Sequence, residues 1–115
     1  MKPYNGINAI PTRIQRNRKH KQVSPNGLPI VYVGRPSKWG NPFIIGIYSE
    51  YREDCLRAYN SWLNGKSNIE YYQSIAGTPP TIEEIKLNLK GKNLSCWCRG
   101  GEYCHADTLL KIANE

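Results

Sequence analysis

The chain has 115 residues, which is enough for one domain with a single modest core. Its four cysteines are too few for a disulfide scaffold, and no apolar stretch approaches the roughly 20 residues of a membrane-spanning helix. Because the N-terminus also lacks the apolar segment of a signal peptide, we expect a cytoplasmic protein that has no membrane partner and whose thiols are free or metal-bound.

The positive charge is concentrated in the first part of the chain. Residues 1–49 contain eight lysines and arginines and no acid, whereas the remainder is almost neutral, and the net charge is +7. This imbalance favours a polyanionic partner, namely nucleic acid or a phosphate-bearing small molecule. The alternative is a solvated basic segment that only promotes solubility.

We divide the sequence into a basic N-terminal arm, residues 1–27, and a single α/β domain, residues 28–115. The arm contains the basic cluster Thr12–Lys21, which has one sizeable apolar residue. A segment with so little to bury is expected to be a loop or arm that is ordered by what it contacts. Arg13 and Arg16 of this cluster are candidate ligand-binding residues, since the arm would close over a bound anion.

Residues 30–33 (IVYV) form the clearest predicted strand, because they are β-branched or aromatic and lie between a proline and a glycine. Apolar residues on both faces indicate a central strand of a covered sheet. The loop that follows, residues 34–43, supplies two cations that would neutralise phosphate, an aromatic residue that would either stack on a base or fill the core, and an amide. These candidate ligand-binding residues are Arg35, Lys38, Trp39 and Asn41.

Residues 43–45 are expected to extend as another short strand. After them, apolar residues at helical spacing predict a helix that follows an N-cap at Ser49 and ends at residues 64–65. Cys55 lies on the apolar face of this helix and is expected to be an inert, packed thiol.

Two shorter helices are predicted before the last strand. One helical turn lies within residues 67–77. Thr81 and Glu84 then form a capping box for a second helix, which ends near Gly91.

The last part of the chain predicts a strand, a tight turn and a helix. Leu94–Cys98 has the alternation of a strand, so its two cysteines share one face, and a turn at residues 99–102 leads into the helix. Cys104 and His105 therefore lie at the N-terminus of this helix, where free N–H groups and the helix dipole favour an anion or a thiolate.

This order of elements predicts an α/β fold, with a small, mostly parallel sheet flanked by helices, for which a Rossmann-like topology is possible. Parallel strands present their carboxyl ends at one edge of a sheet. We therefore expect the loop of residues 34–43 and the turn Cys98–Asp107 to share one cleft.

The cluster of cysteines and histidine has three interpretations. In the first, tetrahedral zinc is held by Cys96, Cys98, Cys104 and His105, although the Cys-x-Cys spacing is unusual for such a site. In the second, Cys104 is a reactive or ligand-contacting thiol in an electropositive setting that includes Arg99, and His105 or Asp107 acts as acid or base. In the third, these side chains pack under the turn and have only a structural role.

Four stretches of the sequence resemble a domain-of-unknown-function family of bacteria and their phages. They are residues 12–16 (TRIQR), 31–43 (VYVGRPSKWGNPF), 89–98 (LKGKNLSCWC) and 104–110 (CHADTLL). The resemblance implies a small α/β protein, often phage-encoded, whose hallmark residues lie in the same two loops. In that setting the protein would act in the host cytoplasm.

Our leading hypothesis is a domain that binds a phosphate-bearing, nucleotide-like ligand in this cleft, where Arg99, Cys104 and His105 would also contact the ligand. Such a domain would sequester a nucleotide or take part in nucleotide or nucleic-acid modification. Two alternatives are a zinc-stabilised nucleic-acid-binding module and a thiol-dependent enzyme that uses Cys104.

Overall fold

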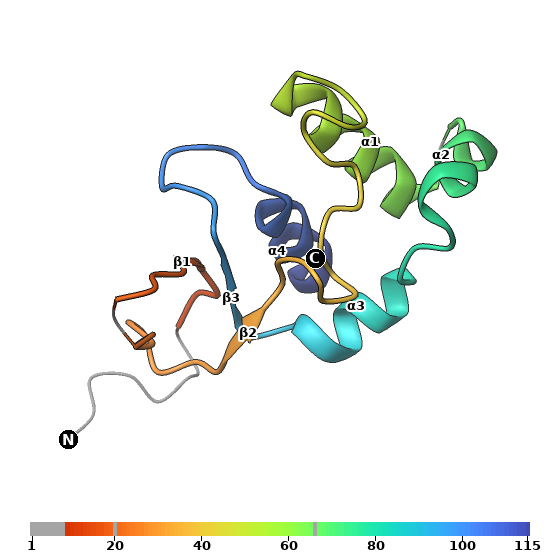
Figure 1. Cartoon of the computed structure of the whole chain (residues 1–115). Coiled ribbons are helices and arrows are strands. Elements are labelled where there is room, and N and C mark those ends of the chain that lie inside the picture. Colours follow the sequence, from red (N-terminus) through yellow and green to blue (C-terminus); the bar gives the residue numbers. More distant parts are fainter. Residues whose placement is uncertain (1–8, 20, 66) are drawn as a thin grey trace.

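The computed structural model describes residues 9–19, 21–65 and 67–115. Within these residues the chain forms three strands and four helices, which are β1 (Arg13–Gln15), β2 (Ile30–Tyr32), α1 (Arg52–Asn64), α2 (Ile69–Ala76), α3 (Ile82–Leu89), β3 (Asn93–Cys96) and α4 (His105–Asn114). Both strand pairings are parallel, and α4 packs against the sheet (Figure 1). The predicted α/β fold with a small parallel sheet is confirmed.

β3 is the central strand of the sheet, whose order is β1-β3-β2. All four residues of β3 are buried, and Leu94 is the register partner of Arg13 in β1 and of Val31 in β2. The prediction that residues 30–33 form the central strand is wrong, since β2 pairs with β3 alone and is only half-buried. The apolar run continues beyond β2 because Val33 enters the core, where it is fully buried.

The basic cluster at residues 12–21 contributes an edge strand of the sheet and is not simply the predicted loop or arm. Arg16 N donates to Cys96 O at 2.7 Å, and Thr12 N donates to Oδ1 of the buried Asn93 side chain at 3.0 Å. Backbone pairing of this kind needs no apolar side chains. The sparse hydrophobicity of the segment therefore gave no sign of the strand.

Residues 43–45 form no strand, contrary to the prediction. Ile45 makes only an isolated bridge to Ser49. Phe43 instead turns into the core, where it meets three aromatic rings edge-on at 5.1 to 5.9 Å between ring centres, namely those of Tyr48, Trp62 and Tyr72. Aromatic packing here outweighs the local preference for an extended strand.

The helices lie where the sequence predicts them. α2 falls within residues 67–77, and the capping box that starts α3 is present. α1 begins at Arg52 rather than directly after Ser49, because Ser49 Oγ accepts from Tyr51 N at 3.1 Å and holds the turn before the helix. Cys55 is buried on the inner face of α1, as predicted.

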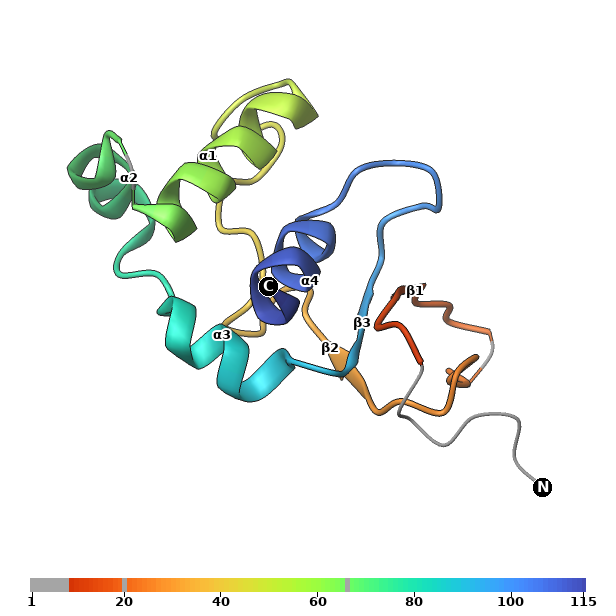
Figure 2. The same ribbon diagram turned by 180° about the vertical axis from the view of Figure 1, so that it is seen from behind.

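The helices gather toward one end of the molecule, and β1 lies toward the other (Figures 1 and 2). α3 and α4 pack on each other, and α4 packs on β3. In the part of the chain that the structure describes, no helix has the length and apolarity needed to cross a membrane. Because all three strands run in the same direction, the segments that follow them emerge at one edge of the sheet.

Candidate functional site

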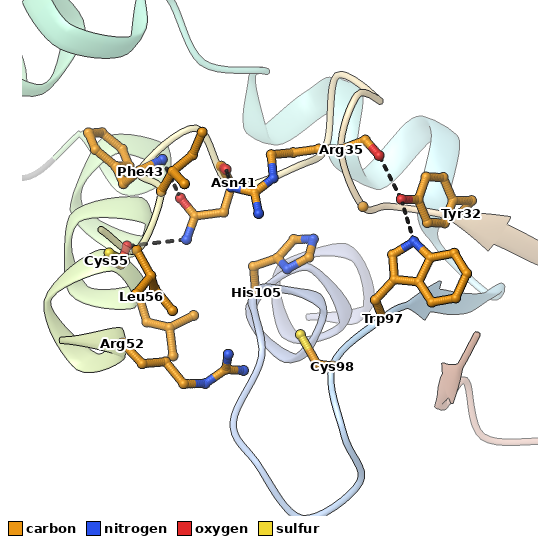
Figure 3. Close-up of a pocket in the computed structure, with 13 residues that line it drawn as sticks. Tyr32, Arg35, Asn41, Phe43, Arg52, Cys55, Leu56, Trp97, Cys98 and His105 are labelled. Atoms are coloured by element: carbon orange, nitrogen blue, oxygen red, sulfur yellow. Dashed lines mark hydrogen bonds between the residues drawn. The ribbon is translucent and has the colours of Figure 1, made fainter. Parts of the chain in front are cut away.

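A pocket of about 300 Å³ lies at the carboxyl edge of the sheet. It is formed by the segment after β2, the first turn of α1, the segment after β3 and the start of α4 (Figure 3). The polar and aromatic side chains that line it include Tyr32, Arg35, Asn41, Arg52, Trp97, Cys98 and His105. The two loops that were predicted to share a cleft therefore do so.

The loop after β2 holds Arg35 at the pocket. Tyr32 Oη donates to Arg35 O at 2.6 Å, and Arg35 Nη1 donates to Asn41 O at 3.4 Å. Gly40 allows this compact shape, because a Cβ at that position would approach the Arg35 backbone nitrogen to 3.0 Å. The Asn41 amide braces the end of the loop through hydrogen bonds to two backbone groups. These hydrogen bonds and the close approach at Gly40 hold the loop in one shape and thereby position the guanidinium of Arg35.

A second arginine, Arg52, reaches the pocket from the first turn of α1. Its Nη2 donates to Tyr103 O at 2.6 Å, and a hydrogen bond to Cys98 raises the pKa of Arg52. Figure 3 shows Arg35, Arg52 and His105 directed toward the centre of the pocket. The described residues that line the pocket include no aspartate or glutamate. Two cations without a carboxylate make the pocket attractive to an anion.

Two predicted ligand-binding residues of the same loop do not line the pocket. Lys38 forms an ion pair with Glu84, and its hydrogen bond lowers the pKa of that carboxyl. Trp39 is 7% exposed and belongs to the core, where its carbonyl oxygen accepts from Tyr59 Oη at 2.7 Å. Of the two roles considered for Trp39, filling the core is the one observed.

Three thiols gather beside the pocket, although β3 ends at Cys96 and does not extend to Cys98. The sulfur atoms of Cys96, Cys98 and Cys104 lie within 4.8 Å of one another, and Cys96 and Cys104 are 3.3 Å apart. His105 adjoins them, with Nδ1 at 3.4 Å from Cys104 Sγ, while its Nε2 donates to Val33 O at 2.7 Å. Three cysteine sulfurs at this spacing can hold a metal ion.

Electrostatics within this thiol cluster favour one thiolate rather than three. Hydrogen bonds from Cys104 and Cys96 lower the pKa of Cys98, whereas hydrogen bonds to Cys104 and Cys98, together with burial, raise the pKa of Cys96. Burial alone would lower the pKa of His105, but hydrogen bonds to Cys104 and Cys98 outweigh it and raise this pKa to about 9. Because like charges repel at this range, ionisation of all three thiols requires a cation among them.

The candidate catalytic residues differ in their access to the pocket. Cys104 is fully buried as the N-cap of α4, whereas Cys98 lines the pocket. Asp107 accepts from Cys104 N at 2.8 Å in a capping box, and its carboxylate pairs with Arg13 at 2.8 Å. These contacts place Asp107 at the start of α4, where it does not line the pocket, whereas His105 does.

Three candidate arginines lie outside the loop of residues 34–43, namely Arg13, Arg16 and Arg99, and they differ in their distance from the pocket. Arg13 ties down the turn before α4, because its guanidinium also donates to two backbone oxygens of that turn at 2.6 and 3.1 Å. Arg99 lies on this exposed turn and does not line the pocket. Arg16 lies beside the pocket, with Cζ 4.5 Å from the centre of the Tyr32 ring and 5.6 Å from that of Trp97.

Residues 14–115 match the family model described as a domain of unknown function, DUF4326. The chain belongs to this family. The resemblance to a domain-of-unknown-function family is thereby confirmed. Comparisons with curated proteins and with solved structures give no match. In this DUF4326 protein, both loops that carry the resemblance contribute side chains to the pocket.

Among the polar and aromatic residues that line the pocket of this DUF4326 protein, sequence reasoning misses Tyr32, Arg52 and Trp97. Arg52 does carry a signal, since a cation in the first turn of a helix opposes the helix dipole and is placed there for another reason. For Tyr32 and Trp97 the signal in the sequence is weaker. Each is an aromatic residue at the carboxyl end of a strand, where open α/β sheets bind ligands.

Proposed function

We propose that the pocket binds a phosphate-bearing, nucleotide-like ligand through Arg35 and Arg52. The observation that carries this proposal is the convergence of two guanidiniums from different elements on a pocket whose described lining contains no carboxylate. A guanidinium pairs with phosphate through two parallel hydrogen bonds, and two guanidiniums suit the double charge of a terminal phosphate.

Both arginines are available for this role. The ion pairs formed among the described residues involve other basic residues, namely Arg13, Lys38 and Arg57. Arg35 and Arg52 hydrogen-bond to backbone oxygens, at 3.4 and 2.6 Å, and these bonds position the guanidiniums. Arg52 also hydrogen-bonds to Cys98, so its charge is shared with that thiol. An incoming anion therefore meets two positioned cations and displaces no carboxylate.

The remainder of the lining suits a sugar and a base. Tyr32 and Trp97 lie together at one end of the pocket (Figure 3), and apolar surface comes from Ile44, Ile45 and Leu56. Aromatic rings can stack on a base, and apolar side chains cover its edge or the sugar. The pocket thus offers both charged and apolar surface, as a nucleotide does.

Isothermal titration calorimetry with inorganic phosphate and the four ribonucleoside 5′-monophosphates tests this proposal. We expect at least one nucleotide to bind, and Arg35→Ala and Arg52→Ala each to weaken binding about tenfold or more, because a hydrogen bond to a charged group contributes about 1.5–3 kcal/mol. Arg57→Ala is the matched control, since Arg57 lies on the same helix as Arg52 but pairs with Asp54 outside the pocket. No binding by any nucleotide, or the same affinity in all three variants, would contradict the proposal.

For the thiol cluster we infer a second function, which is to hold zinc with Cys96, Cys98 and Cys104, and with His105 as the fourth ligand. The spacing of the three sulfurs within 4.8 Å supports this function. The hydrogen bond from His105 Nε2 to Val33 O supports it as well, because it leaves Nδ1 to face Cys104. A zinc ion supplies the positive charge that lets neighbouring thiols ionise together.

Elemental analysis by mass spectrometry, on protein purified without chelator or affinity metal, tests the zinc site. We expect about one zinc per chain in the wild type and none in Cys98→Ser. Cys55→Ser is the control, because Cys55 is a buried thiol outside the cluster, and this variant should retain its zinc. A metal-free wild-type protein would contradict the zinc site and leave the nucleotide pocket untouched.

A further inference from the structure

We propose that the nucleotide bound in the pocket is part of a single-stranded nucleic acid, whose adjoining backbone crosses a platform formed by Arg16, Arg18, Tyr32 and Trp97. This inference rests on the proposed function of the pocket and names its substrate class. It depends on four observations: the construction of the platform, the N–H groups that its arginines can offer to phosphate, the exposure of Trp97, and the continuity of the platform with the pocket.

All three strands of the sheet contribute to the platform at their carboxyl ends. Arg16 and Arg18 follow β1, Tyr32 ends β2 and Trp97 follows β3. Arg16 Cζ lies 4.5 Å from the centre of the Tyr32 ring, and both arginines lie 5.6 Å from the Trp97 ring. Trp97 Nε1 donates to Tyr32 Oη at 3.1 Å, which holds the two rings together. Cations and aromatic rings thus alternate on one surface.

The arginines of the platform can offer their hydrogen-bonding edges to a ligand. A guanidinium over an aromatic ring uses its flat face, and its N–H groups project in its own plane toward whatever lies beside it. Among the described residues, neither Arg16 nor Arg18 forms an ion pair with a carboxylate. Contact with the rings also limits side-chain freedom in advance, so less conformational entropy is lost when phosphate binds.

Trp97 is 47% exposed, whereas Trp39 and Trp62 are buried in the core. Leaving a large indole ring half in water forgoes hydrophobic stabilisation that burial would give. The same ring, set among cations, is the kind of surface on which bases of a single strand stack, at about 1–3 kcal/mol per base. The exposure of Trp97 is therefore explained by a nucleic-acid partner.

The platform and the pocket form one continuous surface. Tyr32 and Trp97 line the pocket as well, and Tyr32 Oη donates to Arg35 O at 2.6 Å. At about 300 Å³, the pocket is at the small end of the range of about 300–1,000 Å³ for small-molecule sites, so it suits one nucleotide. The neighbouring nucleotides of a chain then lie on the platform. A duplex keeps its bases stacked inside, whereas a single strand presents them to both surfaces.

Fluorescence anisotropy with a labelled single strand of about eight nucleotides, in DNA and in RNA form and containing all four bases, tests this inference against calorimetry with single nucleotides. We expect the strand to bind about tenfold more tightly than any mononucleotide, and the logarithm of its affinity to fall with that of salt by about 0.7 for each phosphate contacted. Arg16→Ala/Arg18→Ala should weaken binding of the strand about tenfold, and should weaken it more than it weakens mononucleotide binding.

The matched control is Lys86→Ala/Lys90→Ala, which removes the same charge from exposed positions at the end of α3 and should leave the affinity for the strand within about twofold of wild type. Arg16→Lys/Arg18→Lys retains the charge but lacks the planar guanidinium, and should lose more affinity than this control. The lysine variant decides the matter if the alanine variant does not fold.

The outcomes separate this inference from the proposal on which it rests. Mononucleotide binding with no gain for the strand would overturn the platform alone, as would a strand affinity that is insensitive to Arg16 and Arg18. Equal affinity for the strand and for a duplex of the same length would overturn the assignment to single strands. Absence of binding by mononucleotides and strand alike would overturn both proposals.

Discussion

Arg13 Nη1 donates to Asp107 Oδ2 at 2.8 Å and so joins edge strand β1 to the first turn of α4, 94 residues further along the chain. The same carboxylate oxygen accepts from Cys104 N at 2.8 Å. Two more bonds from the Arg13 guanidinium hold the turn that precedes α4. One side chain near the start of the sheet thus positions the helix end that carries Cys104.

We expect Arg13→Ala to lower the free energy of unfolding by about 2 kcal/mol, since it removes a part-buried charged hydrogen bond to Asp107 and two exposed ones to backbone oxygens, from a side chain that is 14% exposed. Urea unfolding followed by circular dichroism measures this change. Arg57→Ala removes an exposed ion pair within α1 and should cost at most about 0.5 kcal/mol. Equal losses in the two variants would show that Arg13 has no special role in holding the turn.

Asn93 links β3 to the N-terminal segment. Its amide is fully buried, exchanges two hydrogen bonds with Asn26, and also bonds to Thr12 N and Ser24 Oγ. Asn93→Ala leaves buried partners unsatisfied, so we expect a loss of about 3 kcal/mol in urea unfolding. Asn88→Ala, at an exposed position of α3, should cost about 0.5 kcal/mol or less. A small loss for Asn93→Ala would mean that water replaces these bonds.

Removal of metal should destabilise the protein. Zinc bound to the folded state alone adds stability by mass action, and about 2 kcal/mol of such linkage corresponds to a fall of about 8 °C in Tm when the metal is stripped. Differential scanning fluorimetry with and without 1,10-phenanthroline measures the fall, which Cys55→Ser should share and Cys98→Ser should not. A Tm that does not respond to the chelator in wild-type protein would argue against a stabilising metal.

Gly34, like Gly40, is a glycine that the shape of the pocket requires. A Cβ there would lie 2.6 Å from Tyr32 Cζ, so Gly34→Ala must displace the Tyr32 ring and disturb its bonds to Arg35 and Trp97. We expect nucleotide affinity, measured by calorimetry, to fall about tenfold, which is about 1.4 kcal/mol. Gly100→Ala faces open space and should bind as wild type does. Unchanged binding in Gly34→Ala would place the nucleotide away from Tyr32.

Features with a local physical cause could be predicted from the sequence. The capping box at Thr81, the apolar face of α1 and the glycines before α4 act within a few residues, and the helices follow them. The shared edge of parallel strands also placed Arg35 and His105 at one pocket.

Features that depend on distant partners could not be predicted in the same way. β1 exists because its backbone pairs with β3, and residues 30–33 lie at the sheet edge because that same pairing makes β3 central. Arg52 joins the pocket only through the packing of α1 beside the segment that follows β3. Trp39 shows the limit most plainly, since the same loop sequence suits an exposed ring or a buried one, and only the core around it decides.

The strand order has a consequence for how the protein is made. β1 and β2 both pair with β3, and Thr12 and Asn93, which are bonded across this pairing, are 81 residues apart. During synthesis the two early strands leave the ribosome with no partner, and the sheet can close only after residues 93–96 have emerged, which favours slow folding of high contact order. The basic residues around β1 are useful in that interval. Their mutual repulsion keeps an unpaired strand from joining its counterpart in another copy of the chain.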